Sequence, residues 1–136
     1  RDAQESRGLG DVYKRQYLHR GGRVSKTAAI AGSILGIKPL LHVDNEGHLI
    51  PVGKIRGRKQ SIEKLVDMMC ERMGNWDNST VAVCHGDCLS DAEYAADLMR
   101  KKLGKKTTVH ICYTGAVIGS HSGPGTLALF FMGDQR

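Results

Sequence analysis

The stretch Ile118-Gly119-Ser120-His121-Ser122-Gly123-Pro124-Gly125 separates two apolar runs, residues 109–118 and 126–132. Three glycines and a proline within so short a stretch do not continue a helix or a strand, so we expect a loop between two strands. Its centre carries one imidazole and two hydroxyls, which can hydrogen-bond to a polar headgroup. The pattern supports ligand contact by His121 and plain turn chemistry about equally.

Before this loop, helical and strand patterns alternate. Residues 61–73 form the clearest amphipathic helix, because their apolar side chains recur at helical spacing. Two more helices are predicted, over 26–35 behind the N-cap Ser25, and over 91–103, where Ser90 to Glu93 has capping-box spacing. Strands are predicted over 38–43, 48–55, 80–84, 107–113 and 127–131, the first two forming a hairpin around the turn at 44–47. This order predicts an α/β fold with a mixed β-sheet, a β-hairpin and packed helices.

Composition limits the chain to one domain of ordinary size. Of its 136 residues, 40% are hydrophobic and only 5% aromatic, so the core must be mainly aliphatic. No apolar run approaches the roughly 20 residues of a membrane span. The net charge of +6 is spread along the chain, which favours a mildly basic surface over a nucleic-acid partner. The cysteines lack CxxC spacing, and we expect free buried thiols in a reducing cytoplasm at Cys70, Cys84, Cys88 and Cys112.

The first sixteen residues differ from the rest. They are polar, mix charges of both signs and show no sustained apolar period, which is typical of a disordered tail. They also resemble the translated adapter-like sequence that contaminates some assemblies. We therefore expect residues 1–16 to be a non-native or disordered head and exclude them from the fold.

Two further segments carry chemistry-bearing side chains. Residues 81–88 end in His, Asp and Cys, but the Cys-x₃-Cys spacing is weak for zinc, so no metal site is predicted and a core strand with a polar exit loop is favoured. Residues 54–59 are basic, and in an extended segment Lys54, Arg56 and Arg58 share one face. That face suits either a phosphate- or carboxylate-bearing partner or a charged, solvated strand edge.

Four motifs follow one another along the chain, at residues 21–26, 36–41, 53–59 and 118–125. In this order the set resembles the C-terminal half of the DegV family, the fatty-acid-binding proteins of bacteria. The resemblance implies two α/β lobes that hold a long-chain fatty acid in a tunnel between them. Residues 17–136 would form the C-terminal lobe, and the N-terminal lobe would be missing.

The resemblance also implies roles for particular residues. The protein would be a cytoplasmic carrier and not an enzyme, without catalytic residues or cofactor, and its partner would be a fatty acid kinase. Carboxylate binding falls on His121, which we extend to Ser120, Ser122 and Gly123 as further hydrogen-bond donors. Small and apolar residues of the 26–35 helix would line the acyl chain: Ala28, Ala29, Gly32, Ile34 and Leu35. The kinase would meet the basic side chains of Arg23, Arg56 and Arg58.

Two other functions compete with this interpretation. A hydrolase would use Ser120 or Ser122 with His121 and Asp87, but adjacent residues rarely act as nucleophile and base because their side chains diverge. A nucleic-acid-binding domain would use residues 54–59, but no aromatic side chains are interleaved there as a stacking platform requires. Both are less favoured than the fatty-acid carrier.

Overall fold

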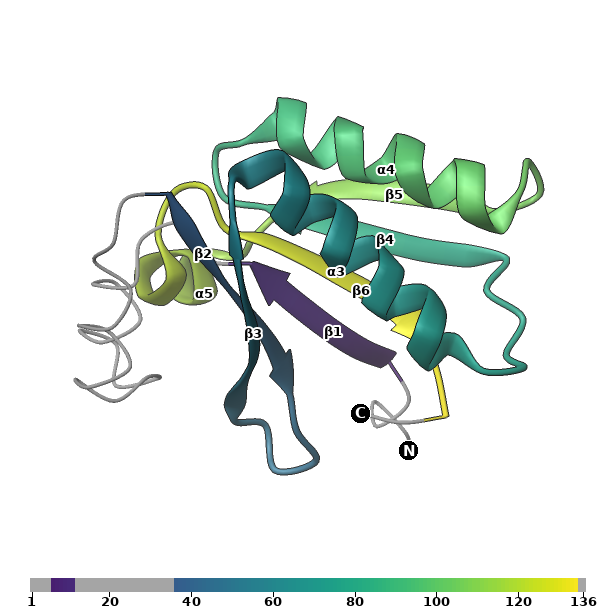
Figure 1. Cartoon of the computed structure of the whole chain (residues 1–136), viewed down its shortest axis with the longest axis horizontal. Helices are drawn as coiled ribbons and strands as arrows, with labels where there is room; N and C mark the ends of the chain where they lie inside the picture. Colours follow the sequence, from purple (N-terminus) through teal and green to yellow (C-terminus); the bar gives the residue numbers. More distant parts are fainter. Residues whose placement is uncertain (1–5, 12–35, 135–136) are drawn as a thin grey trace.

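The computed structural model describes residues 6–11 and 36–134. In these residues six strands form one mixed sheet with the order β3-β2-β1-β6-β4-β5 (Figure 1). The parallel pair is β4 with β5, and all other neighbours are antiparallel. The predicted mixed sheet is confirmed, and its strands are β1 (Ser6–Asp11), β2 (Ile37–Val43), β3 (Leu49–Arg56), β4 (Thr80–His85), β5 (Thr108–Tyr113) and β6 (Leu127–Met132).

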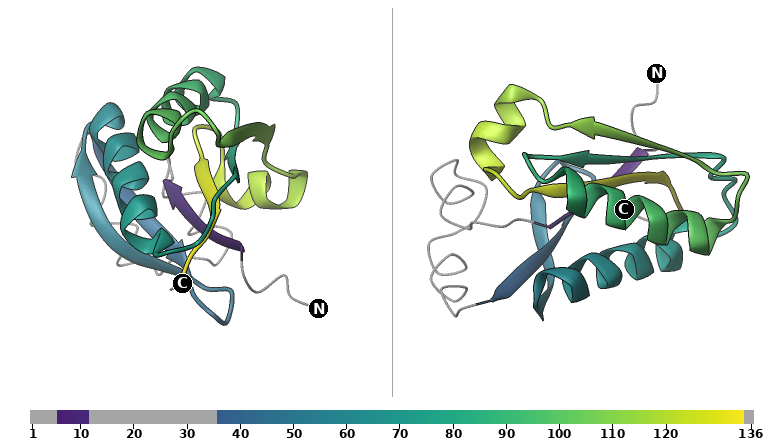
Figure 2. Two further views of the ribbon diagram at one scale, coloured as in Figure 1. Left: turned by 90° about the vertical axis from the view of Figure 1, so that its right-hand side faces the viewer. Right: turned by 90° about the horizontal axis from the view of Figure 1, so that it is seen from above.

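Two long helices cover one face of this sheet. The helix α3 (Arg58–Met73) contacts β1, β2, β3 and β6, whereas α4 (Leu89–Leu103) contacts β4 and β5 and packs beside α3 (Figure 2). Because α4 connects the parallel strands β4 and β5, it is the crossover that such a pair requires. A short third helix, α5 (Ala116–Ser122), lies at the end of the sheet where β5 ends and β6 begins (Figure 1).

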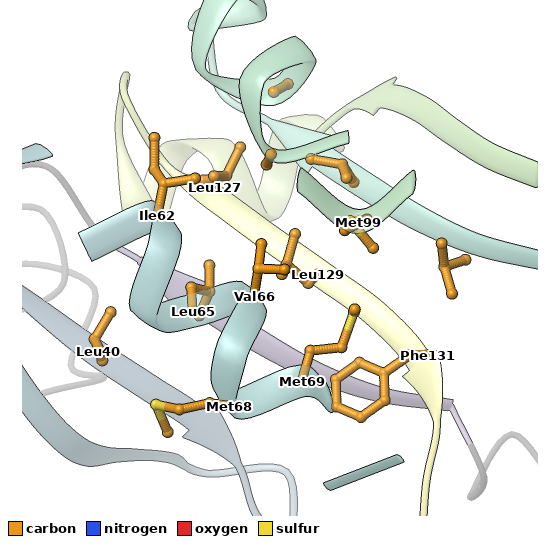
Figure 3. Close-up of a cluster of buried hydrophobic side chains, with 14 residues drawn as sticks. Leu40, Ile62, Leu65, Val66, Met68, Met69, Met99, Leu127, Leu129 and Phe131 are labelled. Carbon is orange, nitrogen blue, oxygen red and sulfur yellow. The ribbon is translucent and has the colours of Figure 1, made fainter. Parts of the chain in front are cut away.

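The core lies between the two long helices and the sheet (Figure 3). The apolar stripe predicted for α3 is confirmed, since Ile62, Leu65, Val66 and Met69 are all buried. They meet every second residue of β6, namely Leu127, Leu129 and Phe131. The residue between the last two, Phe130, points to the opposite face of the sheet by strand alternation and is 36% exposed.

Two helices begin at other residues than the sequence predicted. The helix expected from residue 61 begins at Arg58, and the one expected from 91 begins at Leu89. The capping-box prediction is wrong: Cys88 is the N-cap, no side chain caps this helix, and Ser90 lies within its first turn. The predicted hairpin is confirmed, and Asp44 closes its turn by accepting backbone N–H groups of Glu46 and His48 at 2.9 and 2.8 Å. The helix expected over 26–35 lies outside the described residues.

The excluded head contributes a strand. Ser6–Asp11 pairs with β6 on one side and β2 on the other, so the prediction that residues 1–16 stand outside the fold is wrong for this segment. The physical reason is that a strand pairs with its neighbours through main-chain N–H and C=O groups. Such pairing does not require the apolar side-chain pattern from which strands were predicted. The other residues of the head lie outside the described part.

Two of the four cysteines are paired. Cys84 and Cys112 are direct neighbours in the β4–β5 register, with Cα atoms 4.7 Å apart, and they form a disulfide. The prediction of four free thiols is therefore wrong for this pair and holds for Cys70 and Cys88, which are free and half-buried. Pairing follows from register, because residues opposite each other on adjacent strands point to the same face.

A pair of substitutions in β6 tests which face of the sheet is covered. Leu129→Ala should lower the free energy of unfolding by about 2–5 kcal/mol, since the buried side chain leaves a cavity between α3 and the sheet. Phe130→Ala, one residue further along, should cost markedly less because that ring is already partly in water. Urea unfolding of the two variants measures both values, and equal losses would contradict the burial of Leu129 between the sheet and the two long helices.

Candidate functional site

Four connections meet at one end of the sheet. They are the β3–α3 junction, the β4–α4 connection, the segment from β5 to α5, and the return from α5 to β6. The parallel pairing of β4 and β5 brings His85 opposite Tyr113, and the antiparallel pairing of β4 and β6 brings His85 opposite Leu127. Residues that are far apart in the sequence therefore surround the glycine-rich stretch at residues 118–125.

Backbone contacts hold the end of this stretch against the end of β4. The Gly86 N–H donates to the Thr126 carbonyl at 2.8 Å, and the Gly125 N–H donates to the Gly86 carbonyl at 2.6 Å. An added Cβ at Gly86 would lie 2.9 Å from the backbone oxygen of Gly123, so a side chain does not fit there without a shift of the main chain. The buried Thr126 hydroxyl donates to that same Gly123 oxygen at 2.8 Å.

The predicted loop is partly a helix. Ala116–Ser122 forms the seven-residue α5, and Gly123, with φ of 81°, ends it. Within it the Ser120 hydroxyl donates to the Val117 carbonyl at 2.7 Å, and the buried Ser122 hydroxyl donates to the Ile118 carbonyl at 2.8 Å. Both hydroxyl protons are thus engaged along the helix, so the two serines do not join His121 in one cluster of free donors.

His121 itself stands apart from these bonds. Its imidazole is half-buried in the last turn of α5 and makes no hydrogen bond to any residue that the structure describes. On the same side of the helix, one turn earlier, lie Val117 and Ile118, which are 72% and 61% exposed. Tyr113, at the end of β5, is also 72% exposed. A polar donor is thus set beside large apolar side chains that face water.

Sequence reasoning missed the second histidine of this end. His85 is buried, its Nδ1 accepts the Cys88 N–H at 3.2 Å, and its ring lies 4.4 Å from that of Tyr113 between centroids. Asp87, in the tight turn between His85 and Cys88, has φ of 52°, a left-handed conformation that Asp tolerates better than most residues. The signal available was that residues 81–88 and the glycine-rich stretch both end predicted strands, but nothing in the sequence showed these strands to be neighbours.

Thr114 was also missed. Its hydroxyl forms no hydrogen bond within the described part of the chain, and it lies close to both Gly86 and Gly119, where added Cβ atoms would be 3.6 and 3.4 Å from Oγ1. The hydroxyl therefore sits between the end of β4 and α5. It is a second polar group at this end of the sheet whose hydrogen-bonding capacity remains available to a ligand.

The basic segment at residues 54–59 lies partly on β3 and partly on α3. Lys54 and Arg56 are exposed on β3, but Arg58 is not on their face, because the strand ends at Arg56 and Gly57, with φ of 91°, turns the chain into α3. The Arg58 side chain is 18% exposed and pairs with Asp91 at 2.9 Å. Its Nη2 also donates to the Gly125 carbonyl at 2.8 Å.

Cys88 lies beside this guanidinium and reaches the same return segment. Its Sγ lies 3.7 Å from Arg58 Nη2 and donates to the Thr126 carbonyl at 3.3 Å. Burial raises the pKa of the Cys88 thiol above its usual value, although the Arg58 charge acts in the opposite direction. The thiol therefore stays protonated at neutral pH and serves as a hydrogen-bond donor and not as a nucleophile.

The remaining site residues and chemistries considered from the sequence are not found together in the described part of the chain. The expected acyl-chain residues of the 26–35 helix, and Arg23, lie outside the described residues. The hydrolase geometry is absent from residues 36–134, where neither serine hydroxyl bonds to His121 and no hydrogen bond joins His121 to Asp87. Across the described ranges, no group of three His, Cys, Asp or Glu side chains is arranged to hold a metal ion, and no helix is long and apolar enough to cross a membrane.

Comparison with known proteins places the fold in a family. The model of the uncharacterised DegV family matches residues 11–134, nearly the whole chain. The chain belongs to the DegV family. A DegV domain-containing protein of Clostridium perfringens is 46% identical over 120 residues, which are 88% of this chain and 41% of that protein. The chain thus spans about 41% of the length of this DegV relative.

Solved DegV structures share the fold. A fatty acid binding DegV family protein of Streptococcus agalactiae superposes with a TM-score of 0.80 at 29% identity, covering 96% of this chain and 45% of that one. A DegV family protein of Eubacterium eligens, loaded with heptadecanoic acid, superposes with a TM-score of 0.83 at 25% identity, covering 96% and 46%. The resemblance inferred from the four motifs is confirmed at the level of family and fold.

Close backbone approach at Gly86 generates a prediction. Gly86→Ala should lower the free energy of unfolding by about 1–3 kcal/mol, because its Cβ meets a backbone oxygen that cannot move alone. It should also shift the amide resonances of α5. Gly115→Ala is the matched control, since nothing lies within 4 Å of its added Cβ. Unchanged stability and unchanged α5 resonances in the Gly86 variant would contradict the packing described here.

Proposed function

We propose that this chain is the C-terminal lobe of a fatty-acid-binding protein and that the His121 imidazole donates a hydrogen bond to the fatty acid's carboxylate. The observation that carries the proposal is the composition of α5. It presents one imidazole without a partner among the described residues, beside the exposed side chains of Val117 and Ile118. A fatty acid has the same two parts, a hydrogen-bond-accepting head and an apolar tail.

The comparisons support this choice of ligand. Relatives with 25–29% identity and nearly complete coverage of this chain include one described as fatty acid binding and one loaded with heptadecanoic acid. Because the chain spans less than half of each relative, we propose that the remaining length supplies the second lobe and completes the binding tunnel. The family match begins at residue 11, so we propose a foreign origin only for the residues before it and not for the whole head expected from the sequence.

The acyl tail and the carboxylate of a fatty acid contribute differently to the free energy of binding. About 14 buried methylene groups at about 0.8 kcal/mol each provide a gross driving force near 11 kcal/mol before ordering costs. A buried carboxylate without donors would cancel much of this gain. Affinity therefore comes from the tail, and we propose that His121 and the Thr114 hydroxyl, which lies close to Gly119, select the headgroup. The Ser120 and Ser122 hydroxyls remain available as acceptors only, and the Gly123 N–H is bonded to the Gly119 carbonyl.

A chimera tests the proposal. In the chimera, the matched residues of this chain replace the corresponding 120 residues of the full-length Clostridium perfringens relative, which keeps the rest of its own sequence. Co-purifying fatty acid is detected by native mass spectrometry. In this chimera His121→Ala should speed fatty acid dissociation about tenfold or more, since a hydrogen bond to a charged acceptor is lost. His110→Ala, at an exposed position on β5, is the matched control and should have no effect.

The possible results separate clearly. A folded chimera that holds no fatty acid while its parent does would contradict the proposed function. Equal dissociation rates for the two histidine variants would contradict the role of His121 alone. The isolated 136-residue chain should bind far more weakly than the chimera, because its exposed apolar side chains on α5 have no second lobe to cover the acyl tail.

We further propose that Arg56 contacts a fatty acid kinase that phosphorylates the bound carboxylate. Arg56 and Lys54 are exposed on one side of β3, so they present two cations to a partner. Arg56→Glu should slow phosphorylation of the chimera's fatty acid by about tenfold without changing fatty acid dissociation. Lys105→Glu, in the loop before β5 at the other end of the sheet, is the control. A slowing shared by both variants would show a general charge effect and contradict the contact.

A further inference from the structure

Arg58 links three segments that are distant in the sequence. Its Nε donates to Asp91 Oδ2 at 2.9 Å, which joins the first turn of α3 to the first turn of α4. Its Nη2 donates to the Gly125 carbonyl at 2.8 Å, which joins both helices to the segment that returns from α5 to β6. The guanidinium therefore lies where the two covering helices begin and the glycine-rich stretch ends.

We propose that Arg58 is a positioning residue for the ligand-binding helix: its guanidinium fork fixes Gly125 and thereby the end of α5 that carries His121. Only two residues, Gly123 and Pro124, separate Gly125 from the last residue of α5. A displacement of Gly125 is thus transmitted directly to the last helical turn. The consequence for ligand binding rests on the proposed function, whereas the positioning itself does not.

The same contacts argue against a role for Arg58 as an exposed partner contact. Its side chain is 18% exposed, and the Asp91 carboxylate at 2.9 Å offsets its charge. Asp91 is in turn the acidic residue in the first turn of α4, where the helix dipole favours a negative charge. A kinase phosphate or carboxylate would have to displace these contacts before it could use the guanidinium.

The chemistry requires arginine and not merely a cation. A guanidinium is planar and carries several N–H donors in a fixed fork, so Nε and Nη2 reach Asp91 and Gly125 at the same time. A lysine ammonium is a single point charge on a flexible stem, and it can satisfy the carboxylate while leaving the carbonyl unbonded. Arg58→Lys therefore separates the fork from the charge.

Amide hydrogen exchange of the ¹⁵N-labelled 136-residue chain tests the proposal. In Arg58→Lys the Gly125 amide, which donates to the Gly86 carbonyl, should exchange about tenfold faster or more, because its segment opens locally. The amides of Val83 and Leu129, in the covered strands, should keep their rates. Arg56→Lys, at an exposed basic residue two positions earlier, is the matched control and should change neither.

A Gly125 rate within about twofold of the unsubstituted chain would overturn the proposal. So would a rise shared equally by Val83 and Leu129, because that would show a global loss of stability in place of positioning. Fatty acid dissociation from the chimera distinguishes this inference from the proposed function. If Arg58→Lys speeds Gly125 exchange but His121→Ala leaves fatty acid dissociation unchanged, the positioning role is supported and the ligand role of His121 is contradicted. If Gly125 exchange is unchanged but His121→Ala speeds dissociation, the ligand role is supported and the positioning role is contradicted.

Discussion

Two backbone hydrogen bonds between Gly86 and the segment before β6 hold the candidate site together. They extend the contact of β4 with β6 beyond the last paired residues, His85 and Leu127. The approach is close enough that a Cβ at Gly86 would meet the Gly123 carbonyl oxygen at 2.9 Å. Because this junction is fixed, the chain between β5 and β6 has little freedom, and the short helix α5 must fit between two anchored ends.

The parts of the fold that sequence reasoning predicted are those set by local periodicity. The spacing of Ile62, Leu65, Val66 and Met69 marks one helical face whatever that face packs against, and all four side chains are buried. The same holds for the strands, whose apolar runs are bounded by glycines and polar turn residues. Family membership followed from four short motifs, since their order along the chain is more specific than any one of them.

What sequence reasoning missed depends on pairing across the sheet. The Cys84–Cys112 disulfide and the contact of His85 with Tyr113 both require the knowledge that β4 and β5 are adjacent, parallel and in register. Arg58 was placed on the wrong face because an extended backbone was assumed through Gly57, whose positive φ ends the strand. The helix α5 was missed because seven residues that include a glycine and two serines have little helical preference of their own. Its ends are held by tertiary contacts.

The placement of Arg58 also changes how a carboxylate would be held. A guanidinium aimed at the ligand would form a strong, charge-assisted pair with it. Here that group is engaged by Asp91 and Gly125, so the groups proposed to meet a carboxylate are the His121 imidazole and the Thr114 hydroxyl instead. Hydrogen bonds from such groups select a carboxylate without the strength of a buried ion pair. Under the proposed function, in which a kinase phosphorylates the carboxylate, such a cradle would release the headgroup more readily than an ion pair would, while the apolar tail would keep the fatty acid bound.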